Sequence, residues 1–269
     1  MLHFPDIDPE IFSIGPLHFR WYGLMYVLGF IGAYILVVYQ ANKFQWQKLR
    51  IYVDSLNMHL VIGVILGGRL GYILLYNLPY YLDNPVHILA VWEGGMSFHG
   101  GCLGVLIAGA LFCWRQKLAF WKAADLYVAT VPIGLFFGRL GNFINGELYG
   151  KTTDMPWAMI FPHGGPLPRH PSQLYEAFLE GLVLFCILWS LKGKPWRQEQ
   201  PKPPWVHGAI LSLFLIGYGT ARFLVEIFRE PDPQLGLIFQ GLSMGQILSV
   251  IMVCMGIGLW LILVRRTIT

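Results

Sequence analysis

Charged side chains inside apolar stretches are the residues of this sequence best suited to chemistry. Arg139 directly follows a long apolar run and opens a polar segment, residues 138–150, which also holds Asn142, Asn145 and Glu147. A charge at membrane depth costs about 2.5 to 3.5 kcal/mol on insertion scales, which indicates a functional site. Beside an arginine, the asparagines can bind phosphate or glycerol oxygens. Their more common use is to cap a broken helix end. The alternative is a helix end whose arginine reaches the interface.

Two more arginines fall inside apolar runs, Arg69 and Arg222. Glu226 follows Arg222 by one helical turn, so the two side chains can pair and hold each other in place. Gly63 and Gly67 precede Arg69 with the spacing of close helix packing. Arg69 therefore fits either a binding site or the scaffold around one.

His99 is the best candidate for proton transfer. Its reference pKa near 6.5 suits a base at neutral pH, and Gly100 and Gly101 allow close approach to the ring. The alternative is a structural histidine. No metal site is expected, since His163 and His170 lack ligand-like spacing. We interpret the four cysteines as reduced packing residues without disulfides: Cys102, Cys113, Cys186 and Cys254.

The elements that position these residues are membrane helices. The chain has 269 residues, of which 55% are hydrophobic and 13% charged, against about 25% charged in soluble proteins. The apolar runs are continuous, which favours helices over a barrel. The sequence therefore predicts an all-α integral membrane protein with one seven-span domain, residues 1–269. The predicted spans are about 17–39, 57–77, 97–114, 124–142, 173–191, 207–228 and 242–264.

The start of the fifth span has a local helix signal. Ser172 is predicted to be its N-cap, and Glu176 would then fall in the first turns. We interpret this stretch as a helix start rather than as part of a site.

Loop charge predicts the orientation of the spans. The basic residues of alternate loops and of the tail lie on one side: Lys43, Lys48, Arg50, Arg115, Lys117, Lys122, Lys192, Lys194, Arg197, Lys202, Arg265 and Arg266. The other side has only Arg20, Lys151, Arg169 and Arg229. The positive-inside rule therefore puts the N-terminus outside and the C-terminus in the cytoplasm. The intramembrane arginines then all fall in the outer half of the bilayer. Basic residues are dispersed between apolar runs, so no nucleic-acid partner is expected.

Several segments resemble one family. The run GRLGNFINGELYG at 138–150 is similar to the signature of the prolipoprotein diacylglyceryl transferases. The resemblance extends in order over nearly the whole chain: HFPDIDPEIFSIGP, RWYGLMY, GGRLGYILLYN, GGMSFHGG, LPRHPSQLYE, GYGTARFLVEIFREPD and SMGQILS. The chain departs from some members at Arg20 and in a short loop before 167–169.

The resemblance implies a seven-span enzyme of the bacterial cytoplasmic (inner) membrane, with its active site toward the outer (periplasmic) leaflet. Such an enzyme transfers the diacylglyceryl group of phosphatidylglycerol to the lipobox cysteine of a preprolipoprotein. A thioether forms and glycerol 1-phosphate leaves, in the first step of lipoprotein maturation. The expected partners are the lipid, the signal peptide and the bilayer. No cofactor is expected, and we expect a monomer.

The resemblance also implies site residues. The catalytic set is His99, Arg139, Arg222 and Glu147. The substrate-binding set is Tyr22, Arg69, Tyr76, Asn142, Gly150, Tyr218 and Glu226. In the hypothesis that follows, Arg139 and Arg222 hold the phosphate and stabilise the leaving group. A thiol with a pKa near 8.5 needs a base, for which His99 is the first choice and Glu147 the rival.

Two other functions remain open at this point. A lipid or organic-anion transporter would also carry arginines inside the membrane. Transporter sites, however, tend to lie near the midplane, whereas these residues fall in the outer leaflet. A structural scaffold would leave three intramembrane arginines without a role.

Overall fold

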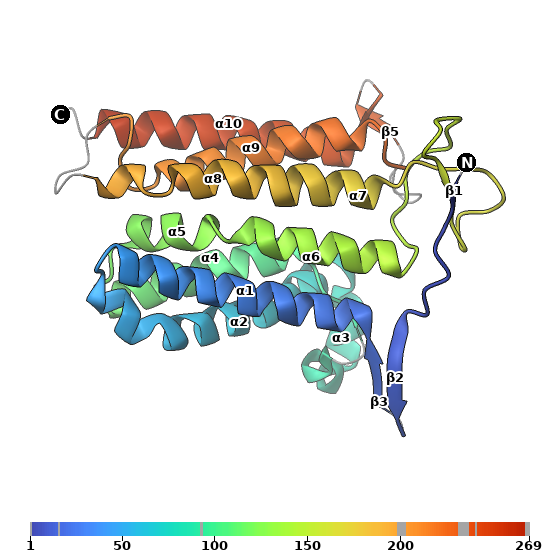
Figure 1. The fold of residues 1–269 in the computed structure, drawn as a ribbon. Coiled ribbons are helices and arrows are strands. Elements are labelled where there is room, and N and C mark those ends of the chain that lie inside the picture. The colour runs from blue at the N-terminus through green and yellow to red at the C-terminus, as the bar shows by residue number, and fades with distance from the viewer. Residues whose placement is uncertain are drawn as a thin grey trace. The chain divides into compact units, whose positions relative to one another are not determined.

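The computed structural model describes residues 2–15, 17–91, 94–197, 203–230, 237–239 and 241–266. Figure 1 draws the helices and strands of the chain. The residues of the chain group into two compact units. Unit 1 is Met1–Val37 with Ala124–Thr269, and unit 2 is Val38–Ala123. Each unit is described by itself below.

Helices make up most of both units. Among the described residues, η1 and η4 are 3₁₀-helices and η3 is a π-helix. In chain order the helices are α1 (Trp21–Lys43), α2 (Gln47–Tyr76), α3 (Leu78–Asp83), η1 (Pro85–Leu89), α4 (Phe98–Arg115), α5 (Phe120–Val128), α6 (Val131–Ile144), α7 (Ser172–Glu176), η3 (Ala177–Val183), α8 (Leu184–Leu191), η4 (Lys194–Trp196), α9 (Ala209–Glu226) and α10 (Met244–Arg265).

The strands are short and pair in twos. They are β1 (Leu2–His3), β2 (Glu10–Ile14), β3 (Leu17–Arg20), β4 (Met159–Ile160), β5 (Leu237–Phe239) and β6 (Leu242–Ser243). The pair β1–β4 is parallel, and the pairs β2–β3 and β5–β6 are antiparallel.

Six helical stretches are long and apolar enough to cross a membrane, counted over the described residues. They are Trp21–Lys43, Gln47–Tyr76, Phe120–Ile144, Ser172–Trp196, Ala209–Glu226 and Met244–Arg265. A shorter apolar helix, His99–Arg115, lies at the predicted third span. The predicted class, an all-α integral membrane protein, is thus confirmed.

The first two helices have other bounds than the predicted spans, about 17–39 and 57–77. The first was placed at 17–39, but residues Leu17–Arg20 form β3, because they pair in a hairpin with β2, and α1 starts at Trp21. The second was placed at 57–77, but α2 starts at Gln47. Its early turns bury Leu49, Val53 and Leu56, whose helical spacing gives this stretch a face to pack inside unit 2.

The predicted fourth span, 124–142, is interrupted. Helix α5 ends at Val128 and α6 begins at Val131, with Pro132 in its first turn. Proline lacks the N–H that would continue the helical ladder, which places it at a helix start. The Thr130 hydroxyl donates to the carbonyl of Tyr127 over 2.7 Å and so satisfies an acceptor at the break.

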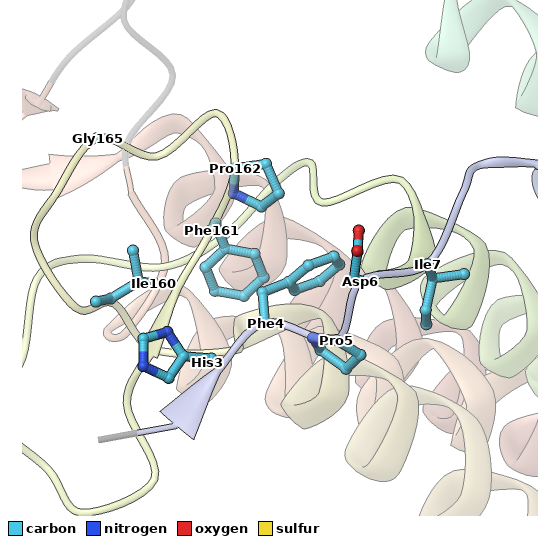
Figure 2. Close-up of a pocket in the computed structure, with 9 residues that line it drawn as sticks. All are labelled: His3, Phe4, Pro5, Asp6, Ile7, Ile160, Phe161, Pro162 and Gly165. Carbon is cyan, nitrogen blue, oxygen red and sulfur yellow. The ribbon is translucent and has the colours of Figure 1, made fainter.

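The N-terminal segment of unit 1 packs on the loop that carries β4. The ring of Phe4 lies 5.3 Å from those of both Phe143 and Phe161. Figure 2 shows these two segments facing one another across a pocket of about 420 Å³, whose lining includes Ile160 and Pro162. The pocket is largely apolar, and the charged residues of the site described below do not line it.

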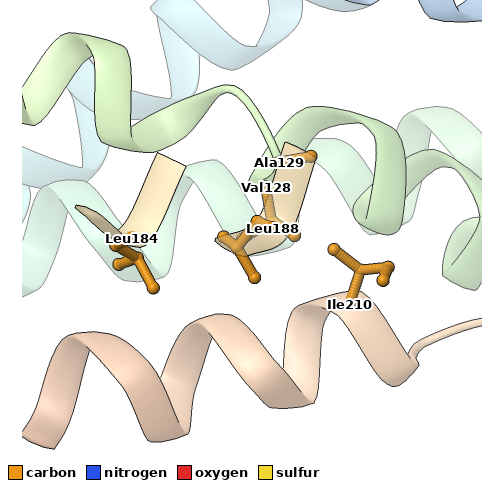
Figure 3. Close-up of a cluster of buried hydrophobic side chains, with 5 residues drawn as sticks. All are labelled: Val128, Ala129, Leu184, Leu188 and Ile210. Atoms are coloured by element: carbon orange, nitrogen blue, oxygen red, sulfur yellow. The ribbon is translucent and has the colours of Figure 1, made fainter. Parts of the chain in front are cut away.

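A buried apolar cluster joins the helices of unit 1. Val128 and Ala129 come from the end of α5, Leu184 and Leu188 from α8, and Ile210 from the first turn of α9 (Figure 3). Ala129, Leu188 and Ile210 are fully buried. Because α9 also packs along α10, this cluster holds the helices that carry the site in register.

Glycines bring α2 and α4 together inside unit 2. A Cβ on Gly67 would overlap the carbonyl oxygen of Gly100, and one on Gly104 would overlap that of Gly63. The predicted packing role of Gly63 and Gly67 is therefore confirmed, since only glycine permits this approach of two helix backbones.

Candidate active site

Three arginines and three glutamates form one group in unit 1, which we call the charge cluster. They come from the last turns of α6, from α7 and η3, and from the end of α9 and the residues after it. The members are Arg139, Glu176, Glu180, Arg222, Glu226 and Arg229. Opposite charges are equal in number, which offsets much of the cost of placing them inside a membrane protein.

Glu176 lies at the centre of the charge cluster, and its side chain is completely buried. Its Oε2 lies 2.7 Å from Nε of Arg139. Its Oε1 lies 2.7 Å from Nη1 of Arg222 and 3.3 Å from Nη1 of Arg229. One carboxylate therefore contacts three guanidinium groups, Arg139 through Oε2 and both Arg222 and Arg229 through Oε1.

The other two glutamates bind the same arginines from the side. Glu226 Oε2 lies 2.9 Å from Nη2 of Arg222, so the predicted pair on one face of α9 is confirmed. Ser243, at the start of α10, donates its hydroxyl to Glu226 Oε1 over 3.1 Å. Glu180 is also fully buried but makes longer contacts, 3.5 Å to Arg139 and 3.7 Å to Arg222.

The carboxylates leave part of each guanidinium available. The contacts of Arg139 engage Nε and Nη2, and those of Arg222 engage Nη1 and Nη2. Within the described part of the chain, no ion pair or hydrogen bond uses Nη1 of Arg139 or Nε of Arg222. Both side chains also remain partly exposed, at 17% and 15%. The arrangement can thus donate hydrogen bonds from two arginines to an oxyanion.

Close packing explains how α6 reaches the glutamates. A Cβ on Gly181, in η3, would lie 2.6 Å from Cβ of Phe136, one turn before Arg139. The absence of a side chain at Gly181 lets the two helices meet there. π-Helical turns are rare and occur frequently at functional sites, and this one contains Glu180. Tyr218 lies one turn before Arg222 and is close enough to interact electrostatically with both arginines.

The loop after α6 presents Glu147. The side-chain amides of Asn142 and Asn145 both donate to Glu147 Oε1, over 2.9 and 3.2 Å. The loop is held by α7, where Gln173 donates to the carbonyl of Glu147 over 2.6 Å and Ser172 donates to that of Leu148 over 3.0 Å. The carboxylate itself is exposed.

The predicted N-cap at Ser172 was wrong. Pro171 occupies the cap position and Ser172 is the first residue of α7. Because Ser172 already lies inside the helix, its side chain does not reach the free N–H groups of the first turn, and its hydroxyl donates to the carbonyl of Leu148 in the loop that carries Glu147.

Gly150 ends this loop in a crowded position. Its N–H donates to the carbonyl of His170 over 2.8 Å, and a Cβ would collide with the carbonyl oxygen of Phe228. The His170 ring contacts Tyr175 and Phe228, and its Nδ1 lies 3.1 Å from the Tyr175 hydroxyl. Burial, and to a lesser extent the nearby charge of Lys151, lowers the pKa of His170.

Tyr22 adjoins the loop from the start of α1. Its ring packs on Gly141, where a Cβ would approach it to 2.9 Å. Its hydroxyl lies 3.0 Å from that of Tyr26. Tyr22 therefore lies against the part of α6 that carries Asn142, within unit 1.

The other three predicted site residues, Arg69, Tyr76 and His99, belong to unit 2. Arg69 is buried and donates to the backbone carbonyls of His87, Ile88, Gly94 and Gly95. Its guanidinium also lies 5.1 Å from the ring centroid of Tyr81. These contacts favour the scaffold interpretation of Arg69, because its donors are used to hold the segment after α3.

His99 stands in the first turn of α4. Ser97 caps that helix, since its hydroxyl accepts from the N–H of Gly100 over 3.2 Å, and its own N–H bonds the carbonyl of Gly68. His99 itself is exposed. Tyr76, at the end of α2, is exposed too and stacks on Tyr72 at 5.7 Å.

Sequence reasoning missed Glu176 and Glu180 as site residues. A usable signal existed, because the two carboxylates stand four residues apart in or beside an apolar run. An acidic residue inside a span is expected to have a functional partner, as an arginine is. No group of three or more His, Cys, Asp and Glu side chains among the described residues could hold a metal ion.

Comparison with known proteins gives a consistent result. The family model described as prolipoprotein diacylglyceryl transferase matches residues 9–262. A protein of Desulfotalea psychrophila named phosphatidylglycerol–prolipoprotein diacylglyceryl transferase is 57% identical over 256 residues, which cover 95% of this chain and 93% of that protein. A protein of the same name from Geobacter sulfurreducens is 53% identical, with 99% of both chains covered. One from Pasteurella multocida is 53% identical and covers 96% of this chain and 93% of its own.

Proposed function

Because the chain belongs to the prolipoprotein diacylglyceryl transferase family, we propose that it transfers the diacylglyceryl group of phosphatidylglycerol to the lipobox cysteine of preprolipoproteins. A C–S thioether bond forms at the cysteine sulfur while the C–O bond to the phosphate breaks. Glycerol 1-phosphate leaves, and the thiol proton passes to a base. The enzyme is a transferase that acts in lipoprotein maturation.

The observation that carries the mechanism is the charge cluster, in which Arg139 and Arg222 are held by one buried carboxylate. The donor lipid is anionic at the group that must leave. Guanidinium N–H groups fixed before the reaction stabilise the charge that develops on the leaving phosphate, without reorganisation during the step. Arg139 and Arg222 are therefore the phosphate-binding residues of the proposal.

The acceptor thiol must lose its proton, because the thiolate is the nucleophile. His99 is the proposed base, since it is exposed at the start of α4 and histidine is the most frequent general base in enzymes. Glu147 is the alternative, as an exposed carboxylate that Asn142 and Asn145 orient. Activity of His99→Gln and Glu147→Gln across pH separates them: loss of the base should be partly rescued at high pH, where the thiol ionises unaided.

The proposed substrate-binding positions in unit 1 are Tyr22, Asn142, Gly150, Tyr218 and Glu226. Glu226 also holds Arg222 in place. Arg69 and Tyr76 also remain proposed substrate-binding positions, and Arg69 supports the segment after α3 by donating to its backbone carbonyls. No metal or diffusible cofactor takes part in the proposed steps.

The proposed topology has seven spans, with α4 as the third and the N-terminus outside. The cluster-bearing ends of α6, α7 and α9 then lie toward the outer leaflet of the cytoplasmic membrane. The C-terminal ends of α8 and α10 lie at the opposite end of unit 1 (Figure 1). Basic residues follow both helices in the sequence, as the positive-inside rule requires of cytoplasmic ends. One protomer carries every residue named in the mechanism, so a monomer suffices.

A product assay tests the function. Purified protein is mixed with phosphatidylglycerol and a synthetic lipobox peptide, and the products are separated by mass. A peptide heavier by one diacylglyceryl group, together with free glycerol phosphate, is expected. A peptide with serine in place of the acceptor cysteine serves as control. Lipid movement across vesicles without any change in the peptide would instead support a transporter.

A further inference from the structure

Glu176 has the most extensive set of contacts in the charge cluster, yet a carboxylate on α7 does not itself bind an anionic lipid. Its two oxygens are committed separately, Oε2 to Arg139 and Oε1 to Arg222 and Arg229. The side chain is fully buried, whereas the two proposed phosphate-binding arginines are each partly exposed. Glu176 therefore lies behind the arginines and can act only through them.

The geometry of each contact determines which donors remain. Glu176 binds Arg139 at Nε, so Nη1 of Arg139 is left for a ligand. It binds Arg222 at Nη1, while Glu226 takes Nη2. A guanidinium held at two of its nitrogens cannot rotate freely, because its N–H groups form a fixed planar fork.

The helix that carries Glu176 is also connected to the neighbouring loop. Gln173, three residues earlier, bonds the carbonyl of Glu147, and Ser172 bonds that of Leu148. One five-residue helix thus contacts both arginines through Glu176 and the Glu147 loop through its first turn.

We propose that Glu176 is a positioning residue for the transfer reaction, which sets the spacing and orientation of Arg139 and Arg222 so that both donate to one phosphate group. The inference rests on the proposed function. Glu180 and Glu226 also balance the charge of these arginines. The inference gives Glu176 a further role, which is to position them.

Two substitutions distinguish positioning from charge balance. Glu176→Asp keeps the negative charge but shortens the side chain by one methylene, so its oxygens cannot hold both arginines as Glu176 does. Glu176→Gln keeps the shape and removes the charge. If the glutamine variant loses its fold because the arginines are left uncompensated, the aspartate variant still decides the question.

The matched controls are two other buried carboxylates of unit 1. Glu180→Asp makes the same change beside the same arginines, where the contacts are only 3.5 and 3.7 Å long. Asp125→Asn changes a carboxylate that bonds backbone N–H groups of α9. Neither control alters the short contacts between Glu176 and the arginines.

The full-length variants are assayed in phosphatidylglycerol–detergent micelles with the lipobox peptide, and their folding is followed by thermal melting. For Glu176→Asp we expect a folded protein whose kcat falls about 10²-fold, the size of loss that a misplacement of about 1 Å can cause. The inhibition constant for added glycerol phosphate should rise, since the same arginines hold the product. Glu180→Asp should lose less, and Asp125→Asn should keep its kcat per folded molecule.

A Glu176→Asp variant with kcat and product inhibition close to wild type would overturn the inference and leave the proposed function intact. An equal loss in Glu180→Asp would overturn it as well, because shortening any buried carboxylate beside these arginines would then have the same effect. A wild-type protein that makes no thioether would overturn the proposed function, and the inference with it.

Discussion

At the scale of single residues, the site depends on which nitrogen of each arginine contacts which glutamate. Arg139 meets Glu176 through Nε and Glu180 through Nη2, and thereby keeps one nitrogen for a ligand. Only a planar guanidinium can contact two carboxylates and a ligand through different nitrogens held in a fixed geometry, because the ammonium of lysine is a point charge. The identity of the cation, and not only its sign, therefore matters here.

Replacing Arg139 with lysine tests this point. Arg139→Lys should fold, since the positive charge still offsets the buried glutamates. Its transfer rate should fall by about 10²- to 10³-fold, as when one preorganised donor is removed from a developing oxyanion. Turnover and a thermal melt measure the two effects. Activity within a few-fold of wild type would mean that a point charge is sufficient at this position.

The lowered pKa of His170 predicts that the stability of the folded protein depends on pH. Trp157 donates to the Tyr175 hydroxyl over 2.7 Å, and that hydroxyl lies 3.1 Å from His170 Nδ1, an arrangement that suits a neutral ring. Because the folded pKa of His170 is lowered, the unfolded chain binds more protons near pH 6. The contribution of neutral His170 to the free energy of unfolding is therefore complete above about pH 6.5, the pKa in the unfolded chain. It is lost as the pH falls below that value.

Thermal melts between pH 5 and 8 (about 1.5 units either side of the histidine pKa) measure this effect. The wild-type melting temperature should decline on the acid side, and His170→Gln should show a smaller decline. An unchanged slope in His170→Gln would assign the dependence to other groups.

At the scale of elements, α9 depends on a carboxylate from another helix. Asp125, in α5, is buried and accepts from the N–H groups of Gly208 and Leu211 over 2.7 and 3.0 Å. It therefore satisfies the start of α9, whose other end carries Arg222 and Glu226. A negative charge at a helix start also suits the helix dipole.

Asp125→Ala should lower the free energy of unfolding by about 1 to 3 kcal/mol, because buried N–H groups lose their acceptor. Activity per folded molecule should change little. Asp154→Ala removes an exposed carboxylate in the same unit and should change stability by less than about 0.5 kcal/mol. Equal melting temperatures for the two variants would show that the cap is not needed.

The packing of α2 on α4 makes a second prediction at this scale. Gly104→Ala should lower stability by about 1 to 3 kcal/mol, since the new methyl would overlap the backbone of Gly63. Gly101→Ala is the control, because its Cβ would lie 3.6 Å from the nearest atom, an ordinary contact. Thermal melting compares them, and similar values would contradict the close approach of the two helices.

At the scale of the whole molecule, the proposed orientation places Asp154 outside and Arg197 in the cytoplasm. Both side chains are exposed and can be replaced by cysteine. In intact cells whose outer membrane admits small molecules, a charged maleimide should label Asp154→Cys directly. It should label Arg197→Cys only after the cytoplasmic membrane is opened. The reverse pattern would invert the topology. Wild type gives the background, and its four cysteines lie in apolar helices.

The sequence by itself determined the membrane class, most helix positions and the nature of the chemistry. Continuous apolar runs specify helices whatever their neighbours are, because a backbone in lipid must satisfy its own hydrogen bonds. The spacing of Arg222 and Glu226 sufficed to predict their pair, since residues four apart share a helix face. The signature around Arg139 sufficed to indicate the family.

Tertiary structure alone decided how the charges combine. Glu176 and Arg139 are 37 positions apart, and Glu176 and Arg222 are 46 apart, so no helical period relates them. Their meeting depends on the contact of Gly181 with Phe136 and on the packing of α9, which single-helix patterns do not encode. For the same reason the short signal at Ser172 was misread as a cap. Pro171 takes the cap position instead, and the Ser172 hydroxyl donates to the carbonyl of Leu148, in a loop that only the folded chain brings near.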